Sequence, residues 1–201
     1  MKVAIVGGAT RTGAQVLSYP LKKYGGDWEI WGLNAIRPRW ADRLGWTRWF
    51  NLHRWKHLKR DWAPGLRAEI AWAQAFPKVP FYVLDPWRKG ALPNQVIFPK
   101  DKLLAMPRGD YHAGSFDWLV AYAVLLGANH IALHGVGLAL DSLRDEPYSA
   151  RACLEYWCGY AQGKGVLVTA AEDCELMAQY HLVKSNSLYG YDDVQLVERR
   201  T

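Results

Sequence analysis

The sequence is poor in cysteine and contains no long hydrophobic run. Its three cysteines, Cys153, Cys158 and Cys174, are an odd number and lack the spacing of a metal site. We expect free thiols in a reducing compartment. The sequence contains no run of about twenty apolar residues, the length needed to span a membrane. Its N-terminus enters a strand pattern without the layout of a signal peptide. The sequence therefore predicts a cytoplasmic protein without a membrane partner.

Signatures of several enzyme classes are also missing. The sequence has no pair of carboxylates arranged for acid–base catalysis and no Walker lysine. His53 and His57 lie four residues apart on one predicted helix face, but no third metal ligand is near them. The acidic residues Asp141, Asp145 and Glu146 are typical of a solvated loop. We therefore expect no metal site.

The hydrophobic pattern indicates one α/β domain. Half of the 201 residues are hydrophobic, which is enough to bury a core. Five segments have the pattern of buried strands: 3–6, 28–33, 79–84, 131–133 and 165–169. Helical patterns cover 14–24, 64–75, 116–126, 146–162 and 171–180, and residues 96–98 form a short helix or strand. The order predicts a Rossmann-like three-layer domain over residues 1–201, with a mostly parallel sheet of five or six strands and a surface tail at 181–201.

The first predicted strand runs directly into a glycine-rich turn. Gly7 and Gly8 follow the strand, and Gly13 closes a small polar segment. Glycines let the backbone approach a ligand closely, and the first turn of a helix favours an anion. The dinucleotide fingerprint would have glycine at position 10, where this chain has threonine. We predict a phosphate-binding turn, with a plain tight turn as the alternative, formed by Gly7, Gly8, Thr10, Arg11, Thr12 and Gly13.

Polar and small residues also follow other predicted strands or precede a helix. Asn34 ends the second strand, where NAD-binding domains have an acidic residue, so it disfavours a dehydrogenase but suits contact with a nucleoside. Gly114 and Ser115 open the apolar helix, with Ser115 as the expected N-cap, and Gly127 ends it. Gly135 follows the fourth strand. We expect Asn34, Gly114, Ser115 and Gly135 at the carboxyl edge of the sheet, where open α/β folds bind ligands.

Two histidines are candidate general bases. His134 ends the fourth predicted strand, and His112 lies shortly before the apolar helix. A positioned imidazole can accept a proton during group transfer. The alternative is that each histidine is a structural or surface residue.

Positive charge and tryptophan are concentrated in residues 37–62, which we name the basic window. It contains eight basic and two acidic residues, a net charge of +6 that equals the formal charge of the whole chain, and five of the eleven tryptophans. The window is an insertion or flap that could bind nucleic acid or an anionic substrate. In the alternative, the tryptophans pack on the sheet and the arginines extend outward. The candidate contacts are Arg37, Arg39, Arg48, Arg54 and Lys56.

The run from Gly114 to Val136 resembles two groups of proteins, the bacterial lipooligosaccharide sialyltransferases and a set of Rossmann-like proteins related to a pterin diphosphokinase. Rossmann-like tailed-phage proteins of unknown role are similar to this chain over much of its length, including the Trp31–Asn34 step. In the sialyltransferases a glycine-rich first turn, an asparagine and a Thr-Ser step surround a cytidine nucleotide. The resemblance implies these roles for Gly7 and Gly8, for Asn34 and for Ser115. Gly135-Val136-Gly137 stands where that family has Gly-Ile-Asp, and no histidine here is matched to its catalytic one.

Together these features predict a Rossmann-like protein that binds a nucleotide or nucleotide sugar. We interpret it as a glycosyltransferase-like enzyme that uses a nucleotide-activated donor. One alternative is a nucleic-acid-associated phage protein that acts through the basic window in the host cytoplasm. The other is a non-catalytic protein that sequesters a nucleotide. The oligomeric state is left open.

Overall fold

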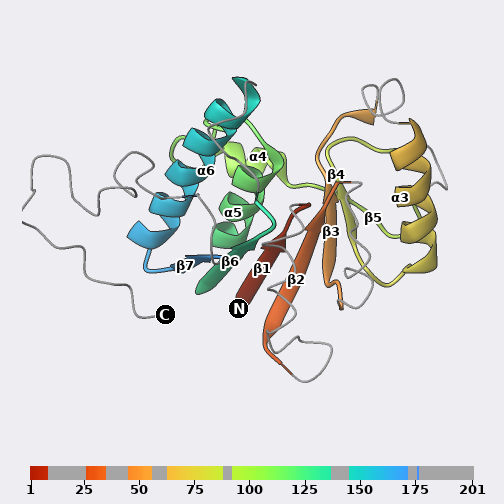
Figure 1. Cartoon of the computed structure of the whole chain (residues 1–201), viewed down its shortest axis with the longest axis horizontal. Helices are drawn as coiled ribbons and strands as arrows, with labels where there is room; N and C mark the ends of the chain where they lie inside the picture. The colour runs from red at the N-terminus through yellow and green to blue at the C-terminus, as the bar shows by residue number, and fades with distance from the viewer. Residues whose placement is uncertain are drawn as a thin grey trace, which may run out of the picture.

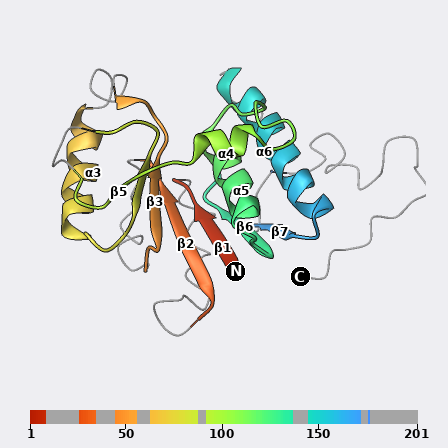
Figure 2. The same cartoon turned by 180° about the vertical axis from the view of Figure 1, so that it is seen from behind.

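The computed structural model describes residues 1–8, 26–34, 45–55, 63–87, 92–136, 145–171 and 176. Within these ranges, one seven-stranded sheet carries helices on both faces (Figures 1 and 2). The strands are β1 (Lys2–Val6), β2 (Trp28–Leu33), β3 (Arg48–Asn51), β4 (Phe81–Val83), β5 (Gln95–Ile97), β6 (His130–His134) and β7 (Leu167–Ala170). The helices are α3 (Ala63–Ala75), α4 (Lys100–Leu104), α5 (Ser115–Leu125) and α6 (Asp145–Gly163).

The sheet order places β1 at a topological switch point. The strands lie in the order β5-β4-β3-β2-β1-β6-β7, and every neighbouring pair is parallel. From β1 the chain proceeds to one edge of the sheet and then returns to β6 on the other side of β1. The predicted Rossmann-like class is confirmed. The predicted count of five or six strands is wrong, because the sheet has seven.

The strand that the pattern did not predict is β3, inside the basic window. It pairs with β2 on one side and β4 on the other, so residues 48–51 are an inner part of the sheet. Four residues that begin with an arginine and end with an asparagine have no clear strand pattern. The segment 79–84, predicted as the third strand, contains β4 instead. Residues 95–97 form a strand rather than a helix, at the edge of the sheet.

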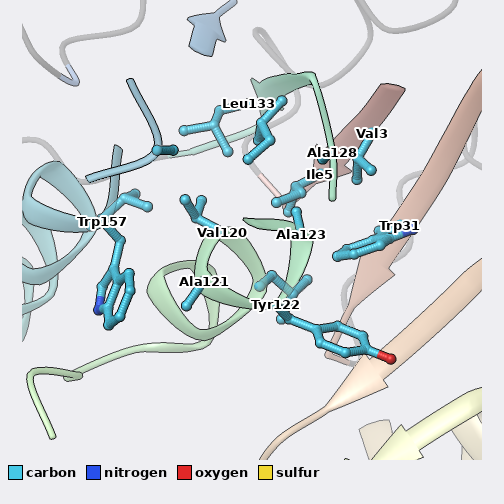
Figure 3. Close-up of a cluster of buried hydrophobic side chains, with 14 of the residues drawn as sticks. Val3, Ile5, Trp31, Val120, Ala121, Tyr122, Ala123, Ala128, Leu133 and Trp157 are labelled. Atoms are coloured by element: carbon cyan, nitrogen blue, oxygen red, sulfur yellow. The ribbon is translucent and has the colours of Figure 1, made fainter. Parts of the chain in front are cut away.

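The largest hydrophobic cluster lies between the sheet and helices α5 and α6. Ile5 and Leu133 are fully buried and belong to this cluster together with Trp31. In Figure 3 the α5 residues lie between the strands and α6, with Trp157 on the α6 side and Tyr122 toward Trp31. The prediction of a central, buried apolar helix is therefore confirmed for α5.

The opposite face of β3 packs against α3. Trp49 is buried there with Phe81 and Trp72, while the adjacent Phe50 points to the α5 face. Gly32 makes room for this arrangement, because a Cβ at Gly32 would lie 2.3 Å from Cζ3 of Trp49. Packing of the window's tryptophans on the sheet is thus confirmed for Trp49.

The two ends of α5 differ in how closely they follow the prediction. Gly127 follows the C-terminal end and has φ of +76°, the left-handed conformation that ends many helices. At the other end the N-cap is Gly114 rather than Ser115. The physical reason is that Asp117, in the first turn, accepts the Gly114 amide hydrogen bond at 2.8 Å. No helix in the described ranges has both the length and the apolar character needed to cross a membrane.

Replacing Gly159 with alanine is expected to stabilise the protein by about 0.5–1 kcal/mol, because glycine in a helix interior costs backbone entropy. Gly159 lies on the exposed side of α6, and an added Cβ would meet no atom within 4 Å. Urea unfolding of the variant measures the change in free energy. The reverse change at exposed Ala152 of the same helix is the matched control and should destabilise by a similar amount. A loss of stability in Gly159→Ala would contradict this description of α6.

Candidate functional site

Two glycines meet at the carboxyl edge of the sheet, where β1 lies beside β6. Val6 is opposite His134 in the register, and the Gly7 amide donates to the His134 carbonyl at 2.8 Å. Gly135 has φ of +66°, and a Cβ there would lie 2.4 Å from the Gly7 carbonyl oxygen. A Cβ at Gly7 would lie 2.7 Å from the Gly135 carbonyl oxygen. Only glycine at both positions allows the two backbones to pass this closely.

The first turn of α5 lies at the same edge. A Cβ at Gly7 would lie 2.3 Å from Cζ of Phe116, so the Phe116 ring is packed against the end of β1. Ser115, next to Phe116, is half-buried, as is Gly8 after Gly7. The structure therefore brings the glycine-rich turn and the start of α5 together.

Asn34 adds an unsatisfied acceptor to this edge. Val6 is opposite Gly32, so Gly8 and Asn34 both lie two residues beyond the same pair. Asn34 has φ of +58°, and its amide donates to the Phe50 carbonyl at 2.8 Å. Its Oδ1 is buried without a hydrogen-bond partner among the described residues. A buried acceptor without a donor costs about 1–3 kcal/mol, and a hydroxyl or amine of a ligand would remove that cost.

His112 forms a hydrogen-bonded pair with Asp117 beside the start of α5. Nδ1 of His112 lies 3.0 Å from Oδ1 of Asp117. The other carboxylate oxygen accepts the amides of Ala113 at 2.9 Å and Gly114 at 2.8 Å. The side chains of His112 and Asp117 are 2% and 0% exposed. The carboxylate therefore fixes both the loop and the imidazole.

Two indole rings enclose the imidazole of His112. The Trp118 ring stacks on it with a centroid distance of 3.6 Å, and the Trp157 ring lies on its other side at 4.9 Å. The Trp157 indole nitrogen donates to the Tyr111 carbonyl at 2.9 Å. Nε2 of His112 is buried and has no hydrogen-bond partner among the described residues. This ring is held rigidly and has one polar atom left for a ligand.

The second candidate base, His134, lies on the opposite face of the sheet. Ile131 and Leu133 belong to the cluster beneath α5, whereas Ala132 belongs to the cluster on the other face. Because side chains alternate along a strand, His134 shares the face of Ala132. Its side chain is buried. The structure therefore does not bring His134 and His112 into one site.

Several predicted ligand contacts have other partners. The Gly7 amide is bonded to His134, and the Gly114 amide is bonded to Asp117. Gly135 packs against Gly7, so the predicted contacts that remain among the described residues of this edge are Gly8 and the side chains of Asn34 and Ser115. The remaining predicted residues of the turn and three of the basic window lie outside the described residues: Thr10, Arg11, Thr12, Gly13, Arg37, Arg39 and Lys56.

Arg48, the first residue of β3, forms a largely buried ion pair with Glu29 of β2. Its Nε donates to Oε2 of Glu29 at 2.9 Å, and its Nη1 donates to the phenol oxygens of Tyr82 and Tyr122 at 3.2 and 3.4 Å. The guanidinium also lies over the Trp31 ring, 5.2 Å from its centroid. Burial lowers the pKa of the Arg48 guanidinium, but Glu29 and the two phenols outweigh it and raise the pKa overall. Arg48 thus has a protein partner for its charge, whereas Arg54 is exposed.

Glu69 of α3 satisfies the buried polar groups on the opposite face of β3. It accepts the Trp49 indole N–H at 3.0 Å and the Asn51 amide at 2.8 Å. The Asn51 side-chain oxygen in turn bonds His53. Among the described residues no three His, Cys, Asp or Glu side chains are grouped as a metal site would require.

Asp117, Phe116 and Trp157 are the site residues that the sequence pattern did not indicate. Asp117 lies at the third position of a helix, where an acidic residue is ordinarily a cap. Its spacing of five residues from His112 was a usable signal, because a loop that turns into a helix can bring such residues together. Trp157 lies 45 residues after His112 on another helix, and no local signal connects the two.

Among the comparisons with known proteins, similarity was found to solved structures. No protein-family model and no curated protein matches the sequence. Two solved structures of the sialyltransferase CstII from Campylobacter jejuni are similar over 98% of this chain and 88% of theirs. One is in complex with cytidine-5'-monophosphate (10% identity, TM-score 0.49) and the other with CMP-3FNeuAc (12% identity, TM-score 0.48).

Proposed function

We propose that this protein binds a nucleotide at the carboxyl edge of β1, β2 and β6, and that it transfers a group from a nucleotide-activated donor such as a nucleotide sugar. The support is that Gly8 and Asn34 both lie two residues beyond the Val6–Gly32 pair at the switch point, and that the buried Oδ1 of Asn34 has no hydrogen-bond partner among the described residues. Open parallel sheets bind ligands at such points. In this proposal Asn34 and Ser115 contact the nucleoside.

The phosphate lies at the turn after β1 rather than on the first amides of α5. Asp117 already accepts the amides of Ala113 and Gly114, so its negative charge would repel a phosphate placed there. Gly8 and residues 10–13 of the turn are the proposed phosphate contacts, with Arg11 as the cation. His112 is the proposed proton acceptor, because it is the candidate base on the α5 side of the sheet.

A substitution at Asn34 tests the proposal without disturbing the backbone. Asn34→Gly removes the carboxamide but tolerates φ of +58°. Removing the unpaired Oδ1 relieves its desolvation cost, while glycine adds conformational entropy to the unfolded chain. These effects oppose each other, so we expect little change in the melting temperature of the free protein. The increase in melting temperature caused by CMP, the nucleotide held by one of the similar structures, should fall sharply in the variant.

Ser115→Ala in the same titration examines the other proposed nucleoside contact. Uridine, adenosine and guanosine monophosphates are measured beside CMP. If none of the four stabilises the wild-type protein, nucleotide binding is refuted. If one binds equally well to wild type and Asn34→Gly, the site lies elsewhere.

A further inference from the structure

We propose that Asp117 is a positioning residue that sets the tautomer of His112, so that Nε2 is the free proton acceptor of the site. The proposal rests on the proposed function, and it adds the class of the second substrate, a hydroxyl compound that loses its proton to Nε2. It is carried by the different partners of the two Asp117 oxygens and by Nε2 of a side chain that is 2% exposed, which has no hydrogen-bond partner in the described part of the chain.

The tautomer follows from the hydrogen bonds. A carboxylate can only accept, so the 3.0 Å contact with Oδ1 of Asp117 requires a proton on Nδ1 of His112. A neutral imidazole has one N–H, and therefore Nε2 carries a lone pair. Carboxylate–histidine pairs of this kind orient general bases in enzymes.

The ring cannot turn to give Nε2 another role. Trp118 and Trp157 stack on its two faces with interplanar angles of 10° and 8°. A half-turn of the ring between them would replace the Nδ1–H bond to Asp117 with a C–H group. The Asp117 carboxylate is itself immobile, since its other oxygen accepts two backbone amides.

The first turn of α5 connects the pair to the proposed nucleotide site. Asp117 follows Phe116, whose ring is packed against Gly7 at the end of β1. In the transfer step the O–H bond of the acceptor breaks and its proton passes to Nε2. The acceptor oxygen bonds to the donor carbon, and the carbon–oxygen bond to phosphate breaks with its electron pair leaving on the nucleotide. Protons and charge then balance without a metal or redox partner.

An asparagine at position 117 should reverse the tautomer. The amides of Ala113 and Gly114 need an acceptor, so the carboxamide oxygen of Asp117→Asn must face them. Its NH2 group then faces Nδ1 of His112, which has to become the acceptor. The proton moves to Nε2, and the base is blocked although the loop keeps its hydrogen bonds. A purely structural role for Asp117 predicts no such reversal.

Histidine labelled with 15N reports the tautomer directly. Spectra of wild type and Asp117→Asn are recorded at about pH 9, where ordinary imidazoles are neutral, with His112→Gln to assign the signals. We expect the proton on Nδ1 in wild type and on Nε2 in the variant. The same tautomer in both proteins, or Nε2–H in wild type, overturns the proposal.

Addition of CMP separates this inference from the proposed function. We expect CMP to bind wild type and Asp117→Asn with equal Kd and to shift the ring signals of His112 in wild type. If CMP binds without moving those signals, His112 is not at the site and the inference fails alone. If none of the four nucleoside monophosphates binds, the proposed function fails and the proton-accepting role fails with it.

Discussion

Replacing Gly135 with alanine is expected to lower the free energy of unfolding by at least about 3 kcal/mol, because it combines backbone strain with overpacking. Gly135 has φ of +66°, and its added Cβ would lie 2.4 Å from the carbonyl oxygen and 2.7 Å from the carbonyl carbon of Gly7. Both atoms are backbone, so no side chain can rotate away. Since the clash separates β1 from β6 at the switch point, nucleotide binding should be lost as well.

Gly127 provides the matched control. It has φ of +76°, close to that of Gly135, but a Cβ there would meet nothing within 4 Å. Gly127→Ala therefore measures conformational strain alone, about 1–2 kcal/mol, and should leave nucleotide binding intact. Urea unfolding of both variants gives the difference. Equal losses of unfolding free energy in the two variants would show that the close contact between Gly7 and Gly135 does not affect stability.

The second large loss of stability is expected from neutralising Glu29. Glu29→Gln should destabilise the protein by about 2–3 kcal/mol, less than breaking a fully buried ion pair costs, because the Arg48 side chain is 20% exposed. The glutamine oxygen can still accept from Arg48 and from the Trp31 indole nitrogen, which both bond Oε2. The loss therefore reports the charge rather than the hydrogen bonds.

A double-mutant cycle isolates this pair. Arg48→Met leaves Glu29 buried without its cation, and the double variant removes both charges. We expect the double variant to be more stable than either single one, since a neutral pair replaces an unpaired charge. Additive losses in urea unfolding would mean that Arg48 and Glu29 do not interact energetically.

The sequence pattern predicts the elements whose hydrophobic period is regular. β1, β2 and β6 are short apolar runs bounded by turn residues, and the uniformly apolar α5 is buried as expected. β3 escapes the pattern because its polar residues are satisfied by tertiary partners. Arg48 finds Glu29 from β2, and Asn51 finds Glu69 from α3. Such pairing depends on the sheet order, which local periodicity does not contain.

The candidate site is predictable to the same extent. A glycine after a central strand and an asparagine after its neighbour are signals of a ligand edge, and Gly7 and Asn34 lie there. Gly7 and Gly135, however, pack against each other, which the spacing of glycines could not reveal. The enclosure of His112 by Trp157 likewise depends on the packing of α6 on α5.

The most direct measurement is a map of backbone amide shifts during titration with CMP and the uridine, adenosine and guanosine monophosphates. The proposal predicts that at least one of them shifts Gly8, Asn34 and Ser115 at the carboxyl edge, and leaves Lys2 at the amino end of β1 unchanged. Shifts confined to Lys2 and its neighbours, or no shift with any of the four, would contradict nucleotide binding at the switch point.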